Sequence, residues 1–246
     1  MKTIVVIPAR YKSSRFPGKP LVKLLGKPMI QWVAELSARA VGKKNVYIAT
    51  DDSRIELAVL EMGYQVVMTS EQCLTGTDRL AEVAQKVEAD IYINVQGDEP
   101  LVSPDDILKV IDAKKAHPND VINGYAVIGE KEDPQSVNIP KVIFTEDKRL
   151  VYMSRQALPG FKDQKNAPSH YYKQVCIYAF SREELLAYGC FGRKSILEHS
   201  EDIEIIRFLE WSQPIRLVET RPGSLAVDVP DDVVKVEVAL RELWGE

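Results

Sequence analysis

The chain has 246 residues, 45% of them hydrophobic and 28% charged, which is enough for one large α/β domain or two small ones. These fractions exclude a disordered, collagen-like or low-complexity chain. The formal net charge of −4 argues against general binding of nucleic acid, because a phosphate backbone requires a positive surface. An anionic ligand would therefore need a local cluster of lysine and arginine.

The cysteines and the start of the chain bear on location. Cys73, Cys176 and Cys190 are widely spaced and form no CxxC pair, which indicates free thiols in a reducing compartment. The apolar run before Pro8 is too short for a signal-peptide core, and no stretch approaches the ~20 apolar residues of a membrane span. The sequence predicts a cytoplasmic protein with no membrane partner.

The first 120 residues alternate predicted strands and helices. Continuous apolar runs predict strands at 3–7, 45–49, 65–68 and 91–95. Apolar residues at helical spacing predict helices that begin at 28, 53, 78 and 104. This alternation indicates βαβ units, and therefore a parallel sheet with right-handed crossovers.

The pattern is less regular after residue 120. Strands are predicted at 123–128, 141–144, 175–180 and 215–219, helices at 198–211 and 230–243, and a mobile loop at 159–169. No repeat and no Pro- or Ser-rich linker separates two domains. The sequence thus predicts a single α/β domain, with a mostly parallel, Rossmann-like twisted sheet, helices on both faces and an inserted, partly antiparallel subregion.

A basic loop follows the first predicted strand. Residues 8–20 contain Arg10, Lys12, Arg15 and Lys19. Ligands of open parallel sheets bind beyond the carboxyl ends of the strands, and this set of cations suits a triphosphate. A merely solvated basic loop is the alternative. The loop matches neither the P-loop nor the GxGxxG fingerprint.

Two further turns are expected on the same side of the sheet. QGDEP at 96–100 follows the fourth strand, and Asp98 is a candidate Mg²⁺ ligand, because Mg²⁺ prefers carboxylates, phosphate oxygens and water. A simple turn former is the alternative. In GTDR at 76–79, Thr77 and Asp78 are candidate helix caps, and capping fits Asp78 better. Arg79 is a candidate ligand residue, because a cation is unfavourable in the first turn of a helix.

Six segments occur in series: IPARYKSSRFPGKPL, GKPMI, ATDD, GTDRLAEV, INVQGDEP and YMSRQALP. In order and spacing, from Ile4 to about Pro230, they resemble the bacterial 3-deoxy-manno-octulosonate (Kdo) cytidylyltransferases, the CMP-Kdo synthetases. The resemblance implies a fold of the nucleotide-diphospho-sugar transferase type. Residues 1–120 would form its nucleotide-binding half, and residues 121–246 would form a sugar-binding half through which a homodimer assembles.

The resemblance also implies roles for individual residues. CTP would contact Pro8, Ala9, Arg10, Ser13, Ser14, Lys19 and Gln96. The sugar-acid pocket would contain Arg79, Gln96, Arg155, Gln174, Tyr178 and Glu204. Catalysis would rest on Arg10 and Lys19, which stabilise the departing pyrophosphate, and on Asp98. The Mg²⁺ ligands would be Asp98 and Asp228.

The implied reaction joins CMP to a 2-keto sugar acid. The anomeric hydroxyl of the acid would attack the α-phosphorus of CTP, and pyrophosphate would leave. Carboxylates with Mg²⁺ would orient the hydroxyl and neutralise the triphosphate, and arginines would bind the sugar carboxylate. The scattered histidines, His117, His170 and His199, are not expected to be catalytic. The product would serve the synthesis of lipopolysaccharide or capsule.

Three segments depart from the family pattern. KQVCIY at 173–178 replaces a stretch that usually resembles KHVGIY, so Gln174 stands for a histidine. Ile205 stands for the glutamine of EQLR, and residues 224–230 differ from the usual TGVDTP but keep Asp228. Loss of a polar partner in the sugar pocket costs roughly 1–3 kcal/mol. Either the acceptor is modified, for example 8-amino-3,8-dideoxy-manno-octulosonate, or the pocket has drifted and repacked.

Two other functions fit the motifs less well. A sialate-type cytidylyltransferase is disfavoured, because PARYKSSRFPGKPL and QGDEP match the Kdo enzymes better. A non-catalytic nucleotide-binding regulatory module would have no need for Lys19, Asp98 and Asp228 together.

Overall fold

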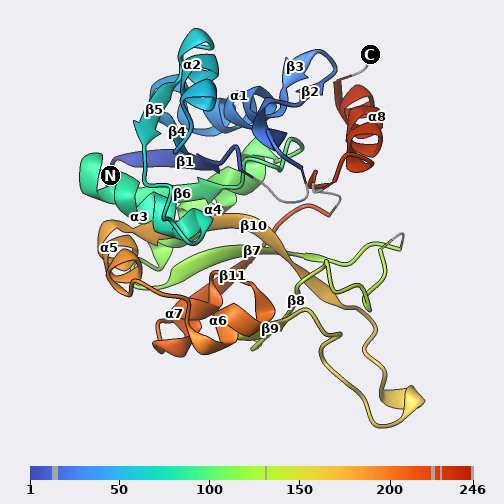
Figure 1. Ribbon diagram of the computed structural model, residues 1–246. Coiled ribbons are helices and arrows are strands. Elements are labelled where there is room, and N and C mark those ends of the chain that lie inside the picture. Colours follow the sequence, from blue (N-terminus) through green and yellow to red (C-terminus); the bar gives the residue numbers. More distant parts are fainter. Residues whose placement is uncertain (13–15, 131, 223–224, 228, 245–246) are drawn as a thin grey trace.

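A mixed β-sheet with helices on both faces forms the centre of the molecule (Figure 1). The computed structural model describes residues 1–12, 16–130, 132–222, 225–227 and 229–244. Within this part of the chain the sheet contains nine strands. They are β1 (Thr3–Ala9), β4 (Val46–Thr50), β5 (Gln65–Met68), β6 (Ile91–Val95), β7 (Val121–Val127), β8 (Lys141–Phe144), β9 (Leu150–Ser154), β10 (Tyr172–Ser181) and β11 (Ile215–Glu219).

The main path of the sheet runs β11-β7-β10-β6-β1-β4-β5, with β8 and β9 attached through β10. Neighbouring strands are parallel on both sides of β10, as in β6-β1-β4-β5 and β7-β11. β10 is antiparallel to β6, β7 and β8. The predicted mostly parallel sheet with an antiparallel part is therefore confirmed, and the antiparallel strand lies in the middle of the sheet.

Helices cover both faces of this sheet (Figure 1). The described residues form α1 (Met29–Val41), α2 (Ser53–Glu61), α3 (Gly76–Lys86), α4 (Pro104–Ala116), α5 (Arg182–Cys190), α6 (Ile196–Glu201), α7 (Ile206–Glu210) and α8 (Asp232–Trp244). α1, α2 and α4 bury apolar residues with one face of the sheet, and α3, α5 and α7 with the other. Because both faces are covered, strands such as β6 are buried along their whole length, as the continuous apolar runs predict.

Two parts of the second half differ from the prediction. The expected helix at 198–211 is wrong: α6 ends at Glu201, Asp202 adopts a left-handed conformation with φ 50°, and α7 begins at Ile206. Strand β9, helix α5 and the short hairpin of β2 (Lys23–Leu24) and β3 (Lys27–Pro28) were not predicted. The expected loop at 159–169 lies in an arm that projects from the body (Figure 1) and contains a short 3₁₀ turn, Gln164–Asn166.

The carboxyl ends of β1 and β6 lie against each other. A Cβ atom added to Gly97, in the turn after β6, would lie 2.9 Å from the carbonyl oxygen of Pro8 in β1. Only glycine allows so close an approach of two backbones. The basic loop and the QGDEP turn therefore begin side by side, as predicted from the parallel sheet.

Two further observations concern the cysteines and the helices. Cys73, Cys176 and Cys190 are free thiols. Among the described residues, none of the helices combines the length and the apolar composition that a membrane span requires.

Candidate active site

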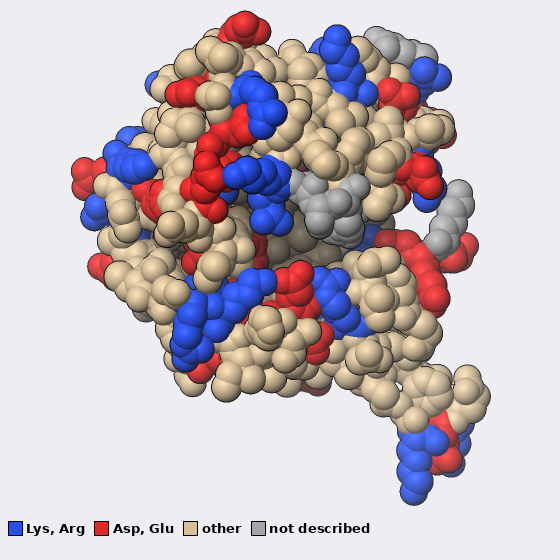
Figure 2. Space-filling model, viewed as in Figure 1, with Lys and Arg blue, Asp and Glu red and all other residues tan. Residues whose placement is uncertain are grey.

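A cleft of about 1130 Å³ opens at the carboxyl ends of β1 and β6, and Figure 2 shows the hollow with lysine and arginine side chains along both rims. Its volume exceeds the ~300–1,000 Å³ of ordinary single-ligand pockets. Eleven predicted site residues line it: Pro8, Ala9, Arg10, Lys19, Arg79, Gln96, Asp98, Arg155, Gln174, Tyr178 and Glu204. The other three, Ser13, Ser14 and Asp228, lie outside the described residues.

An ion pair between Lys19 and Asp98 joins the basic loop to the QGDEP turn. The Lys19 Nζ lies 2.6 Å from the Asp98 Oδ2, and both side chains are partly exposed to the cleft. Gly18, in a left-handed conformation with φ 70°, starts the turn that presents Lys19. The Val227 N–H donates to the Asp98 carbonyl at 3.0 Å. The chain segment just before position 228 is thereby attached to Asp98.

Arg79 lines the cleft but already has partners. Its side chain is 4% exposed, and its guanidinium pairs with Asp51 at 3.2 Å and donates to Thr69 and to the Ser70 carbonyl. Asp51 thus compensates the cation in the first turn of α3. The cap of this helix is Thr75 and not Asp78, since the Thr75 Oγ1 accepts from the Asp78 N–H.

Arg155 holds the opposite wall of the cleft together. Its guanidinium donates to the main-chain carbonyls of Glu201, Val137 and Asp202. These carbonyls belong to the end of α6, the chain before β8 and the turn after α6. Arg155 therefore fixes these segments relative to one another while its charge lies at the cleft.

Glu204 lines the cleft, and two donors hold its carboxylate. The Gln96 Nε2 donates to Oε1 at 2.9 Å, and the Thr77 N–H donates to Oε2 at 3.0 Å. Burial raises the pKa of Glu204 above its ordinary value. Tyr178 on β10 lines the same region, and burial raises the pKa of its hydroxyl well above the usual range, so Tyr178 is a neutral hydroxyl at physiological pH.

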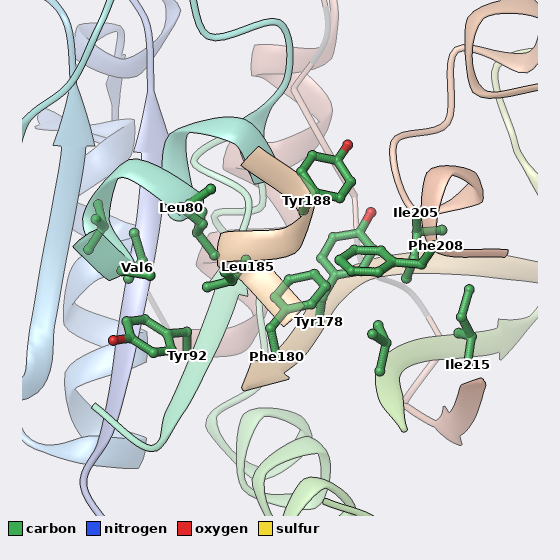
Figure 3. Close-up of a cluster of buried hydrophobic side chains, with 14 of the residues drawn as sticks. Val6, Leu80, Tyr92, Tyr178, Phe180, Leu185, Tyr188, Ile205, Phe208 and Ile215 are labelled. Atoms are coloured by element: carbon green, nitrogen blue, oxygen red, sulfur yellow. The ribbon is translucent and has the colours of Figure 1, made fainter. Parts of the chain in front are cut away.

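Of the two departures that were expected at the sugar, one lies in the cleft. The Gln174 Nε2 donates to the Asn123 Oδ1 at 3.3 Å. Asn123 in turn donates to the Val175 and Ile177 carbonyls, at the bulge in β10. Ile205 instead belongs to the buried hydrophobic cluster (Figure 3), 1% exposed. The prediction that Ile205 stands at the sugar is therefore not supported.

Sequence reasoning missed two lysines of the cleft. Lys194, between α5 and α6, lies 2.6 Å from the Asp202 Oδ1, and Lys173 on β10 pairs with Glu132. The Lys194 hydrogen bond and the nearby charges of Arg155 and Arg10 hold the pKa of Asp202 low. Lys194 stands in no recognisable motif, and Lys173 begins the KQVCIY segment but was not among the expected site residues. The fold brings both to the cleft.

The donor set suits a hard cation shared with phosphate. The described residues contain no group of three or more His, Cys, Asp or Glu side chains that could hold a metal by themselves. Asp98 offers one carboxylate at the cleft. Mg²⁺ commonly takes one or two protein carboxylates and completes its shell with substrate phosphates and water.

A model of the family described as cytidylyltransferase matches residues 4–215. The chain belongs to the cytidylyltransferase family. One relative, from Shewanella oneidensis, is the 8-amino-3,8-dideoxy-manno-octulosonate cytidylyltransferase, 40% identical over 98% of this chain and 99% of that protein. The protein of that name from Shewanella baltica is 38% identical, also over 98% of this chain and 99% of that protein.

Solved structures agree with this family. A CMP:2-keto-3-deoxy-manno-octonic acid synthetase in complex with CTP has a TM-score of 0.91 and 38% identity, covering 99% of this chain and 100% of that one. A 4-diphosphocytidyl-2C-methyl-D-erythritol synthase from Anaerococcus prevotii has a TM-score of 0.61 at 12% identity, covering 98% and 99%, which shows the fold alone. This cytidylyltransferase is therefore an enzyme of the nucleotidyltransferase class with the predicted fold.

Proposed function

We propose that this cytidylyltransferase transfers CMP from CTP to Kdo or a closely related 2-keto sugar acid and releases pyrophosphate. The observation that carries the proposal is that one cleft contains both halves of such a site. The Lys19–Asp98 pair suits phosphates and a metal, and the Gln96–Glu204 pair suits sugar hydroxyls. The names of the similar proteins point to the same reaction.

In the proposed mechanism the chain positions two substrates and stabilises charge. The anomeric hydroxyl of the sugar acid loses its proton to water, and its oxygen forms a bond to the α-phosphorus. The bond from that phosphorus to the bridging oxygen of the pyrophosphate breaks. Lys19 and Arg10 stabilise the negative charge of the departing pyrophosphate. Gln96 and Glu204 bind hydroxyls of the sugar, and Arg155 provides positive charge for its carboxylate. Arg79, which is paired with Asp51, lines the same region.

Magnesium is part of this proposal. Asp98 would hold Mg²⁺, together with Asp228, which follows the Val227 that is bonded to Asp98. When bound, the ion neutralises the triphosphate and lowers the pKa of the attacking hydroxyl. The pairing with Lys19 would keep the Asp98 carboxylate oriented for the ion.

The acceptor has two candidates. Kdo is the first, and the 8-amino sugar acid is the second, because it appears in the names of the Shewanella relatives. Because the Gln174 Nε2 donates to Asn123, its Oε1 can accept a hydrogen bond from a ligand. An accepting oxygen suits either a hydroxyl or an ammonium group on the sugar.

Pyrophosphate release tests the proposal directly. The enzyme is assayed with CTP and Mg²⁺ against Kdo, the 8-amino sugar acid and sialic acid in parallel, and with UTP or ATP in place of CTP. We expect release with CTP and at least one of the two Kdo-type acids. Release with sialic acid alone would overturn the assigned acceptor, and equal release without any acceptor would overturn the transferase reaction.

We further propose that residues 1–246 form one domain, that the enzyme is a cytoplasmic homodimer, and that its product serves lipopolysaccharide or capsule synthesis. The resemblance supports these points, with residues 121–246 supplying the dimer contacts. Light scattering of the purified enzyme checks the assembly. A monomer at working concentration would contradict it.

A further inference from the structure

One buried hydroxyl outside the cleft is bonded to the main chain of a cleft residue. Tyr188 lies on α5 and is fully buried, within the cluster that also contains Ile205 and Phe208 (Figure 3). Its hydroxyl donates to the carbonyl oxygen of Glu204 at 3.1 Å. The carboxylate of the same Glu204 is held from the other side by Gln96 and by the Thr77 N–H.

The same hydroxyl also reaches two helix ends. It lies 3.3 Å from the Oγ1 of Thr75, the cap of α3, and 3.3 Å from the Oε1 of Glu198 in α6. The start of α3 carries Thr77, which donates to Glu204. Tyr188 therefore joins the Glu204 main chain to the element that supplies one of the two donors for the Glu204 side chain. Burial raises the pKa of Tyr188 well above its usual range, so the hydroxyl keeps its proton.

A buried arginine holds the Tyr188 ring in place. Arg207 is 0% exposed, and its guanidinium carbon lies 3.7 Å from the centre of the Tyr188 ring. Its Nε and Nη2 each donate to Glu198 at 2.7 Å, and Nη1 donates to Asp78 at 2.8 Å. Buried charges persist only when they are paired and hydrogen-bonded. The ring thus lies against a network that has little freedom to move.

We propose that Tyr188 is a positioning residue for the sugar acid: its hydroxyl sets the position of Glu204, so removing it weakens acceptor binding and leaves CTP binding unchanged. Tyr188 is not itself a catalytic residue, since it contacts the acceptor site only through Glu204 and Thr75. The inference rests on the proposed function, which assigns the Glu204 region to the sugar acid.

Tyr188→Phe tests the proposal, with Tyr92→Phe as the matched control. Tyr92 is equally buried in the same cluster, and its hydroxyl is bonded to Val87 and Ala89 at the opposite end of β6. A lost hydrogen bond is worth ~0.5–1.5 kcal/mol, so Tyr188→Phe should raise the KM for the sugar acid by about 2- to 12-fold. The KM for CTP should change by less than about twofold in either variant.

The route through Glu204 is tested by combining substitutions. In a Glu204→Ala background, Tyr188→Phe should have no further effect on the KM for the sugar acid. If the two effects instead multiply, Tyr188 does not act through Glu204. Equal changes in Tyr188→Phe and Tyr92→Phe, or no change in either, would also overturn the proposal.

A measurement without substrates separates this inference from the proposed function. Amide hydrogen exchange at Thr77 reports its bond to Glu204, and Tyr188→Phe should accelerate that exchange more than Tyr92→Phe does. Wild-type enzyme that turns over none of the sugar acids would overturn the proposed function alone. Unchanged exchange at Thr77 would overturn the positioning role, whichever acids are substrates.

Discussion

At the scale of single residues, the Lys19–Asp98 pair is the most direct link between the structure and catalysis. Asp98→Asn should abolish turnover without loss of the fold, because an amide cannot supply the charge that a hard cation requires. Steady-state kinetics measures the loss of turnover, and a thermal melt checks that the fold is retained. Asp112→Asn, at an exposed residue of α4 that pairs with Lys115, should leave turnover unchanged. Near wild-type turnover of Asp98→Asn would remove Asp98 from the metal site.

Lys19 is expected to act in the transition state. Lys19→Ala should lower kcat/KM by the equivalent of at least ~2.7 kcal/mol, in line with other preorganised groups that stabilise developing charge. Steady-state kinetics with varied CTP measures this, with Lys115→Ala on α4 as a control far from the cleft. A change confined to the KM for CTP would make Lys19 a binding residue only.

The three cysteines should differ in reactivity. Burial and the hydrogen bond to Glu82 raise the pKa of Cys73 to about 12, and burial together with Glu99 and Asp98 raises the pKa of Cys176 well above the usual range. Only the thiolate is nucleophilic. At pH 8 we therefore expect iodoacetamide to label the exposed Cys190 first, as followed by mass spectrometry. If Cys176 were labelled as fast as Cys190, the raised pKa of Cys176 would be contradicted.

At the scale of elements, the contact between the turn after β6 and the end of β1 should be intolerant of added volume. A Cβ at position 97 would lie 2.9 Å from a backbone oxygen, whereas one at Gly160, in the arm, would meet nothing within 4 Å. Gly97→Ala should therefore lower the free energy of unfolding by about 1–3 kcal/mol and reduce activity. Gly160→Ala should do neither. Chemical denaturation compares the two, and equal stabilities would contradict the close approach.

The elements predicted best are those whose signal is local. β5, β6, β8 and β11 have the bounds that their apolar runs predict. Helix α5 has an equally local signal that was overlooked, the Ser181–Glu184 capping box. The break between α6 and α7 was not predictable in this way, because position 202 is an aspartate and not a helix-breaking glycine or proline. Asp202 is held in its left-handed conformation by two tertiary contacts. Its carboxylate pairs with Lys194, and its carbonyl oxygen accepts a hydrogen bond from Arg155.

At the scale of the whole molecule, the position of the site followed from topology. Parallel strands place the loops after β1 and β6 at one edge, and motifs on those loops identified Lys19, Gln96 and Asp98. The far wall was less predictable. Lys194 reaches the cleft from a loop that matches no motif, and Lys173 belongs to the KQVCIY segment but had no expected role. Ile205 shows the opposite error: a position taken from the family pattern lies in the core. Side-chain direction there depends on packing that the sequence does not reveal.

The central claim is that this cleft directs a sugar acid onto the α-phosphorus of CTP. The measurement that tests it most directly uses CTP labelled with ³²P at the α-position, with Mg²⁺ and a Kdo-type acid. We predict that the label appears in a sugar nucleotide, that the released pyrophosphate is unlabelled, and that both products require the acid. Label in free CMP, formed at the same rate with and without the acid, would show hydrolysis and contradict the account.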